Sequence, residues 1–275
     1  MYNSPGTRPV KLAIVQTKPV FGDIAGNRKR ALEMLESVHA DLYVLPELCL
    51  SGYVFAEAKE VERLAEGLDD GSARAFVDFS RKRRSYVVFG FAERADRIYN
   101  SAALVGPDGL VGVYRKVHLF DREQILFAPG NMGFPVFDLP FGRIGMMICF
   151  DWIFPESARS LALHGAQLIA HPSNLVLPYC PEAMVTRCLE NRVFAATADR
   201  IGREARAGVD LTFIGASQVV TPTGIVELRL QRDEERVGVV EVDLAAAMNK
   251  CVTPVSNVIE GRRPDQYSLG ASHVG

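Results

Sequence analysis

Short apolar runs alternate with amphipathic segments along most of this 275-residue chain. The apolar runs predict buried strands over residues 10–16, 41–46, 86–92, 136–139, 143–149, 167–171, 194–199 and 236–242. Apolar positions at helical spacing predict helices over residues 27–39, 59–67, 72–84, 155–164 and 181–190. Two turn signals, GPDG at 106–109 and PTG at 222–224, predict hairpins that join 100–105 to 110–116 and 217–221 to 225–230.

The order of these elements predicts the fold class. Strands alternate with helices in both halves of the chain, and each half also carries a hairpin, so mixed sheets covered by helices are expected. Two such halves predict two sheets stacked face to face with helices outside, a four-layer αββα sandwich of the α/β class. No low-complexity linker separates the halves, so residues 1–275 are expected to form a single domain.

Composition narrows the possible partners. The chain is 48% hydrophobic and 23% charged with a net charge of −2, which allows a sizeable core and argues against nucleic-acid or membrane-surface binding. Residues 1–9 lack the apolar core of a signal peptide, and no apolar stretch is long enough to cross a bilayer. The five scattered cysteines form neither a disulfide framework nor a zinc-binding spacing. A cytoplasmic protein without a metal or a membrane partner is expected.

Three chemically distinctive residues stand at the ends of apolar runs. Cys149 closes one run and precedes a helix that Pro155 opens, a setting expected to favour the thiolate. Glu47 and Lys116 each follow another predicted strand. Because open α/β sheets bind ligands at strand ends, these residues can combine as nucleophile, base and oxyanion stabiliser.

The residues alone leave the base open. Histidine is the usual base for a catalytic thiol, and both His118 and His171 lie near predicted strand ends. Glu47 is the better candidate base, because it shares its position at a strand end with Lys116 and Cys149. Taken singly, a structural ion pair is the commoner role for such a glutamate, and a solvated side chain at a strand end for such a lysine.

Three motifs in register resemble the nitrilase superfamily of carbon–nitrogen hydrolases: LPEL at 45–48, YRKVHL at 114–119 and CFDWIFPE at 149–156. The resemblance runs in order over essentially the whole chain, and it includes YNSA at 99–102 and EQILFAPG at 123–130. Three further segments are similar to the branch with archaeal thermostable aliphatic nitrilases, namely 149–159, 171–174 and 189–192. Each motif alone is short, but several in order are specific.

The resemblance implies a catalytic Glu–Lys–Cys triad of Glu47, Lys116 and Cys149. It implies that Glu123 is a fourth residue that positions substrate and supports Lys116, and that no cofactor is needed. It also implies a homodimer or higher homo-oligomer, assembled through the helix at 155–164 and the extended tail at 253–275.

The activity implied is hydrolysis of a small aliphatic nitrile or amide to ammonia and a carboxylic acid. Cys149 would attack the carbon to give a thioimidate or thioester, and Lys116 would stabilise the negative charge together with the main-chain N–H of Phe150. Candidate substrate-binding residues are Tyr53, Phe150, Trp152 and Asn174, although core packing is an equal alternative for the aromatic ones. Asp151 is a candidate for orienting the turn at the cysteine.

Two alternatives stay open for the substrate and the activity. Family members that bind N-carbamoyl-D-amino acids carry arginines shortly after the cysteine, where this chain has Trp152 and Ile153. The apolar pair favours a neutral substrate over an N-carbamoyl amine, without removing that alternative. The other alternative is a binding module of the same fold with weak catalysis.

Overall fold

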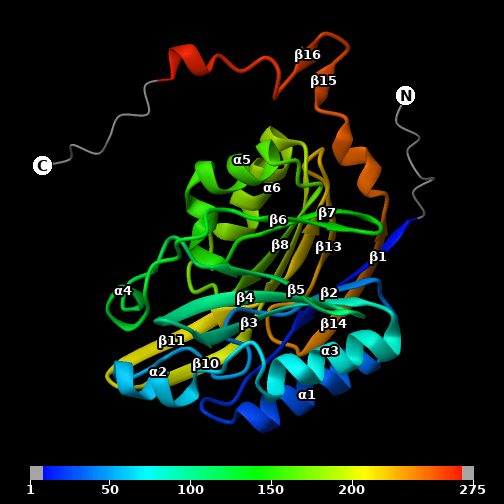
Figure 1. Cartoon of the computed structure of the whole chain (residues 1–275). Coiled ribbons are helices and arrows are strands. Elements are labelled where there is room, and N and C mark those ends of the chain that lie inside the picture. The colour runs from blue at the N-terminus through cyan, green and yellow to red at the C-terminus, as the bar shows by residue number, and fades with distance from the viewer. Residues whose placement is uncertain (1–8, 268–275) are drawn as a thin grey trace, which may run out of the picture.

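The computed structural model describes residues 9–267 and consists of two six-stranded sheets packed face to face, with helices on both outer faces (Figure 1). The first sheet has the strand order β14 (Arg236–Val242), β1 (Val10–Gln16), β2 (Leu42–Val44), β3 (Tyr86–Arg94), β4 (Ile98–Gly106) and β5 (Gly109–Arg115). The second has the order β13 (Val226–Arg229), β12 (Gln218–Val220), β9 (Phe194–Asp199), β8 (Leu168–Ser173), β7 (Gly142–Met146) and β6 (Val136–Leu139).

Both sheets follow the same plan. Strands β1, β2 and β3 are parallel to one another in the first sheet, as are β7, β8 and β9 in the second, and antiparallel strands flank each set. This pairing confirms the predicted mixed sheets and the four-layer αββα sandwich.

Each sheet is covered by a pair of helices. On the first, α1 (Ile24–Glu36) buries Ala31 and Leu35, and α3 (Gly71–Arg83) buries Phe76 and Phe79. On the second lie α5 (Pro155–Leu163) and α6 (Cys180–Asn191), whose apolar faces join the main core. Helix α1 starts three residues before its predicted beginning because the Asp23 carboxylate accepts a hydrogen bond from the Gly26 N–H and caps it.

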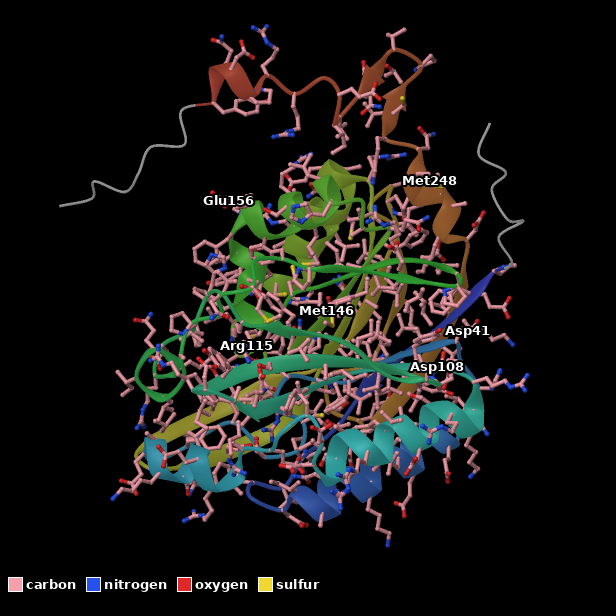
Figure 2. The ribbon with its side chains drawn as sticks, viewed as in Figure 1. Asp41, Asp108, Arg115, Met146, Glu156 and Met248 are labelled. Carbon is pink, nitrogen blue, oxygen red and sulfur yellow. The ribbon has the colours of Figure 1, made fainter. Side chains whose placement is uncertain are left out.

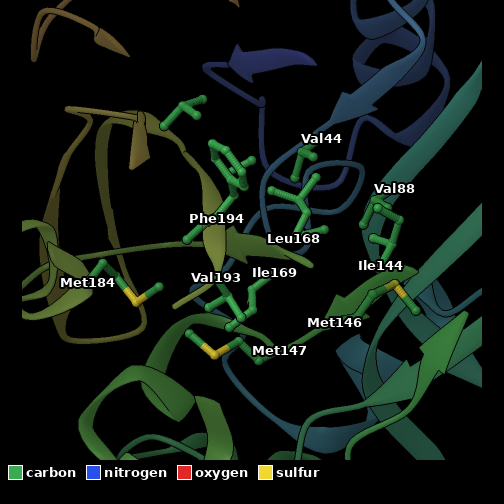
Figure 3. Close-up of a cluster of buried hydrophobic side chains, with 14 of the residues drawn as sticks. Val44, Val88, Ile144, Met146, Met147, Leu168, Ile169, Met184, Val193 and Phe194 are labelled. Carbon is green, nitrogen blue, oxygen red and sulfur yellow. The ribbon is translucent and has the colours of Figure 1, made fainter. Parts of the chain in front are cut away.

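The main core lies between the two sheets. Val44 and Val88 from the first sheet face Ile144, Met146 and Leu168 from the second (Figure 3). All five are fully buried. Because both faces of these strands are covered, they are apolar at nearly every position, which is why they were recognisable in the sequence.

The direction of the strands places two predicted site residues at one end of the first sheet. Since β5 is antiparallel to β4, and β4 to β3, strands β2 and β5 run the same way. Figure 2 shows Asp41, just before β2, and Asp108, just before β5, at one end of the strands. Arg115, the last residue of β5, lies toward the other end. Glu47 and Lys116 follow these strands.

One predicted strand is shorter than expected, and one hairpin was not predicted. The strand predicted over 143–149 ends at Met146, and Cys149 instead begins a short 3-10 helix, η1 (Cys149–Ile153). The hairpin β10 (Ile201–Arg206)–β11 (Val209–Ile214) was not predicted, because charged residues interrupt its apolar positions and it forms a separate two-stranded sheet. The short helices α2 (Ala58–Leu64) and α4 (Glu123–Leu126) lie near this hairpin (Figure 1).

The tail at 253–275, expected to be extended, contains short regular elements in its described part. A 3-10 helix at Leu244–Met248 leads into β15 (Cys251–Thr253) and β16 (Ser256–Asn257), and a 3-10 turn follows at Pro264–Gln266. Residues 268–275 of the predicted interface tail lie outside the described part of the chain. Between residues 9 and 267, no helix is long and apolar enough to cross a membrane.

Candidate active site

Lys116 is buried between two carboxylates. Its Nζ lies 2.6 Å from Oε1 of Glu47 and 2.7 Å from Oε2 of Glu123. The three side chains are at most 3% exposed. Burial alone would lower the pKa of Lys116, but attraction to Glu123 and Glu47 outweighs it and raises that pKa, so the side chain stays an ammonium ion.

Glu47 has one paired and one free carboxylate oxygen. Oε1 accepts hydrogen bonds from Lys116 and, at 2.6 Å, from Nδ2 of Asn100, whereas the buried Oε2 has no partner among the described residues. Burial raises the pKa of Glu47 to about 7 against the opposing pull of Lys116. A free oxygen on a carboxylate with this pKa is suited to accept a proton near neutral pH.

Close backbone packing fixes the position of Glu47. A Cβ atom on Gly90 of β3 would lie 2.5 Å from the Cα of Glu47, far inside van der Waals contact. Only glycine therefore allows the strand and the Glu47 loop to approach this closely.

Cys149 sits on a sharp turn at the end of β7. Its φ of +41° is in the left-handed region, which non-glycine residues rarely adopt. The Asp151 carboxylate holds this turn: Oδ2 accepts hydrogen bonds from the Ile148 N–H at 2.8 Å and from the Tyr114 hydroxyl at 2.6 Å. Asp151 thus orients the turn, as expected from its position.

The thiol of Cys149 is not predisposed to ionise. Burial, and after it the charge of Glu47, raise the pKa of Cys149 well above its usual range, and they outweigh Lys116 and the main-chain N–H of Asn174. The expectation that the helix opened by Pro155 favours the thiolate was wrong, because η1 separates Cys149 from the start of α5 and the charges of Glu47 and Glu123 oppose ionisation. Attack by this sulfur therefore requires a base.

The two candidate histidines are occupied elsewhere. His171 forms hydrogen bonds through Nε2 to the main-chain oxygen of Cys149 at 3.0 Å and through Nδ1 to Thr197 Oγ1 at 3.1 Å. Burial lowers the pKa of His171 to about 4, so it is neutral at physiological pH. His118 contacts Asp151 through Nδ1 at 2.8 Å and stacks on Phe154. Both rings buttress the turn around Cys149.

A mostly apolar pocket of about 260 Å³ opens on Cys149. Of the predicted substrate-binding residues, Phe150, Trp152 and Asn174 line it, and the sequence had not singled out its other lining residues: Phe120, Leu175, Val176 and Leu177. The side chain of Asn174 is buried, and neither polar atom of its amide has a partner among the described residues.

Tyr53 lies apart from this pocket. It lines a neighbouring cavity of about 420 Å³ together with Glu123, and its hydroxyl donates a 2.6 Å hydrogen bond to Oε1 of Glu123. Phe120 contributes to both cavities. Tyr53 therefore contacts the Glu123 carboxylate that pairs with Lys116, and the charges of Glu47 and Cys149 also act on its hydroxyl.

No role for Asn100 was predicted from the sequence, although the motif YNSA at 99–102, which contains it, was part of the family resemblance. It lies on β4, and its amide reaches across to Glu47. The polar dipeptide Asn100–Ser101 at the head of an otherwise apolar strand was the available signal. Within residues 9–267, no group of three His, Cys, Asp or Glu side chains is arranged to hold a metal ion.

Comparison with known proteins identifies the family. The family model of the carbon–nitrogen hydrolases matches residues 11–249. A nitrilase of Pyrococcus abyssi is 45% identical over 263 residues, which cover 94% of this chain and 99% of the relative. An (R)-stereoselective amidase of Pseudomonas is 37% identical over 242 residues, covering 86% and 85%. The chain belongs to the carbon–nitrogen hydrolase family, and the resemblance seen in the sequence is confirmed.

Solved structures share the fold. A carbon–nitrogen hydrolase from Helicobacter pylori superposes with a TM-score of 0.85 at 24% identity, covering 94% of this chain and 97% of its own. A superfamily protein from Xanthomonas campestris, with an arsenic adduct in its active site, gives 0.82 at 23% identity, covering 96% and 100%. The fold is that of the nitrilase superfamily, and the relatives indicate an enzyme that hydrolyses carbon–nitrogen bonds.

Proposed function

We propose that this protein cleaves a small aliphatic nitrile or amide through a covalent intermediate on Cys149 and releases ammonia and a carboxylic acid. The observation that carries the proposal is the buried Lys116, held between Glu47 and Glu123, with Oε2 of Glu47 left without a partner. A buried ion pair with a free carboxylate oxygen, close enough for its charge to raise the pKa of Cys149, is costly to maintain for structure alone.

The proposed reaction begins with transfer of the thiol proton from Cys149 to Glu47 as the sulfur attacks the substrate carbon. The Lys116 ammonium and the main-chain N–H of Phe150 stabilise the charge that develops on the substrate oxygen or nitrogen. Glu47 returns its proton to the departing nitrogen, and ammonia leaves. Glu47 then removes a proton from water, which attacks the intermediate and frees the acid and the thiol. A nitrile requires one further water to reach the same thioester.

The pocket supports a neutral substrate. Its walls are aromatic and aliphatic side chains, with Asn174 as the polar exception besides Cys149. Trp152 stands where relatives specific for N-carbamoyl-D-amino acids carry arginine, so an anionic substrate would lack a counter-ion here. Both a nitrilase and an amidase are among the relatives, and the triad serves either reaction.

Ammonia release from a panel of short aliphatic nitriles and amides tests the proposal. The native protein should release ammonia from at least one class, and Cys149→Ala should release none. Ammonia from neither protein would favour a binding module. Equal release by both proteins would show that Cys149 is not the nucleophile.

The rate should depend on pH through Glu47. Because this residue accepts a proton, it must be ionised, and burial raises its pKa to about 7. We expect kcat/KM for a neutral amide to fall about tenfold per pH unit below pH 7 and to level off above it. Initial rates between pH 5 and 9 measure this. A fall in rate centred near pH 4.5, the pKa of an ordinary glutamate, would contradict the assignment of Glu47 as the base.

We further propose that the protein acts as a homodimer in the cytoplasm, where a catalytic thiol stays reduced. The described part of the tail supports a partner contact because Val255 is 94% exposed and Tyr267 is 48% exposed. Figure 1 shows β15, β16 and the following segment standing clear of the sheets. A cavity of about 730 Å³ lies between this segment and the start of α5.

Removal of residues 253–275 should therefore reduce the mass measured by light scattering toward that of a monomer. Val255→Asp should weaken association as well, since it places a charge on an apolar contact. Leu110→Asp, at an exposed apolar position of β5, is the matched control and should leave the mass unchanged. An unchanged mass in the truncated protein would exclude the tail as the interface.

A further inference from the structure

Glu204, on β10, is a buried carboxylate that holds the loop carrying Tyr53. It is 6% exposed. Its Oε2 accepts hydrogen bonds from the main-chain N–H of Val54 at 2.7 Å and of Tyr53 at 3.1 Å, and its Oε1 lies 3.2 Å from the same Tyr53 nitrogen. A glutamate far along the sequence thus fixes two consecutive peptide groups of this loop.

Two arginines complete the contact, Arg200 directly before β10 and Arg206 at its end. Arg200 pairs with Glu204 and lies 4.0 Å over the ring of Phe213, so the buried negative charge is compensated. Arg206 donates a 2.5 Å hydrogen bond to the main-chain oxygen of Val54. The Tyr53 ring also meets Phe213 edge to face. The hairpin therefore holds the Tyr53 loop through its N–H groups, its carbonyl and its ring.

The loop in turn reaches the triad. The Tyr53 hydroxyl donates to Oε1 of Glu123, and the same oxygen lies 2.9 Å from Nζ of Lys116. Lys116 also pairs with Glu47. Hydrogen bonds at both ends of the Tyr53 residue, its main-chain N–H and its hydroxyl, therefore link Glu204 on β10 to Glu123, Lys116 and the proposed general base.

We propose that Glu204 is a positioning residue. It acts through Tyr53 and sets how strongly Lys116 pairs with Glu47 relative to Glu123. The inference rests on the proposed function. With the phenol in place, the charge of Glu123 is shared among three donors, the Tyr53 hydroxyl, Lys116 and the main-chain N–H of Phe120. Without it, Glu123 attracts Lys116 more strongly, the Lys116–Glu47 pair weakens, and protonation of Glu47 becomes easier.

The fall in rate at acidic pH, called the acidic limb below, reports how strongly Lys116 pairs with Glu47. The titratable and charged groups that act on or near Glu47 are Lys116 after β5, Glu123 on α4, Cys149 on η1, Asp199 on β9 and Tyr53 on the loop before α2. Glu204→Gln leaves these groups in place, but an amide NH₂ group, which donates, replaces one of the two carboxylate oxygens that accept hydrogen bonds from the loop. We expect it to lower kcat/KM about tenfold and to move the limb up by about half a pH unit or more.

The matched control is Asp210→Asn on the same hairpin. Asp210 pairs with Arg203 on the exposed side, so its loss should leave the rate and the limb unchanged. A purely structural role for Glu204 would reduce the rate equally at all pH values without moving the limb, and that result would overturn the inference.

A double-mutant cycle tests whether Glu204 acts through Tyr53. Tyr53→Phe should shift the limb in the same direction, and Glu204→Gln should then add no further shift. Additive shifts would overturn the inference. Because Glu204→Gln leaves Arg200 buried without its counter-ion, the cycle is repeated with Arg200→Gln/Glu204→Gln, which removes both charges together.

Alkylation of Cys149 by iodoacetamide, followed by peptide mass spectrometry, measures the strength of the same pairing without turnover. Its pH dependence should shift upward in Glu204→Gln as the rate profile does. If the native protein hydrolyses no substrate, the proposed function fails, whereas this alkylation shift still decides the role of Glu204. Turnover that depends on Cys149, with neither profile shifted, leaves the function standing and overturns the inference.

Discussion

Replacing Glu47 by glutamine is expected to lower kcat by about 10³-fold, the scale of a lost general base, with little effect on the fold. Glutamine is nearly isosteric, and Oε1 can still accept the hydrogen bond from Asn100. The amide, however, cannot take the proton of the Cys149 thiol, whose pKa burial raises above its usual range. Steady-state rates measured beside a thermal unfolding scan separate the catalytic effect from the structural one.

A matched control for this substitution is Glu241→Gln. Glu241 forms an exposed ion pair with Lys11 between β14 and β1, and its loss should leave kcat unchanged. If Glu47→Gln kept more than a tenth of the native rate, another group would be the base. His118→Ala and His171→Ala would then be the next variants to measure.

Replacing Lys116 by methionine is expected to abolish turnover and to lower the free energy of unfolding by about 3–5 kcal/mol. Methionine fills much of the same volume, but it leaves Glu47 and Glu123 buried near each other without a counter-ion. Two carboxylates in such a site cannot both stay ionised, so the pKa of Glu47 should rise beyond its native value.

This loss of stability should depend on pH. A carboxyl group whose pKa is higher in the folded than in the unfolded state binds more protons when folded, so the stability it removes grows as pH rises. The deficit of Lys116→Met, measured by urea unfolding, should therefore be larger at pH 8 than at pH 5.5. Lys82→Met, which removes an exposed pair with Glu36, should cost less than about 1 kcal/mol at either pH. If Lys116→Met lowered the free energy of unfolding by less than about 1 kcal/mol, that result would contradict the buried network of Lys116, Glu47 and Glu123.

The sequence predicted most of the two main sheets because their strands are covered on both faces. Strands such as β8 and β9 are buried at every position, and each begins with a run of three apolar residues, Leu168–Ala170 and Phe194–Ala196. The β10–β11 hairpin escaped prediction because Arg200, Glu204 and Arg206 look like surface charges in a sequence. In the structure they are folded inward onto the Tyr53 loop.

The candidate site was predicted in part for the same reason. Glu47 and Lys116 stand just beyond apolar runs, so the common direction of β2 and β5 brings them to one end of the sheet. The contact of Tyr53 with Glu123, and of Asn100 with Glu47, depends on how a loop and a neighbouring strand pack, which no local pattern specifies. The raised pKa of Cys149 likewise follows from burial beside Glu47, which the sequence does not show.

Peptide mass spectrometry of an acid-quenched reaction tests the central claim most directly. During turnover of an amide or nitrile found by the ammonia screen, the peptide containing Cys149 should gain the mass of the substrate's acyl or imidoyl group. The gain should be lost in Cys149→Ala. Covalent catalysis at this sulfur would be contradicted if Cys149 stayed unmodified and turnover persisted in Cys149→Ala. An adduct carried by another residue would contradict it as well.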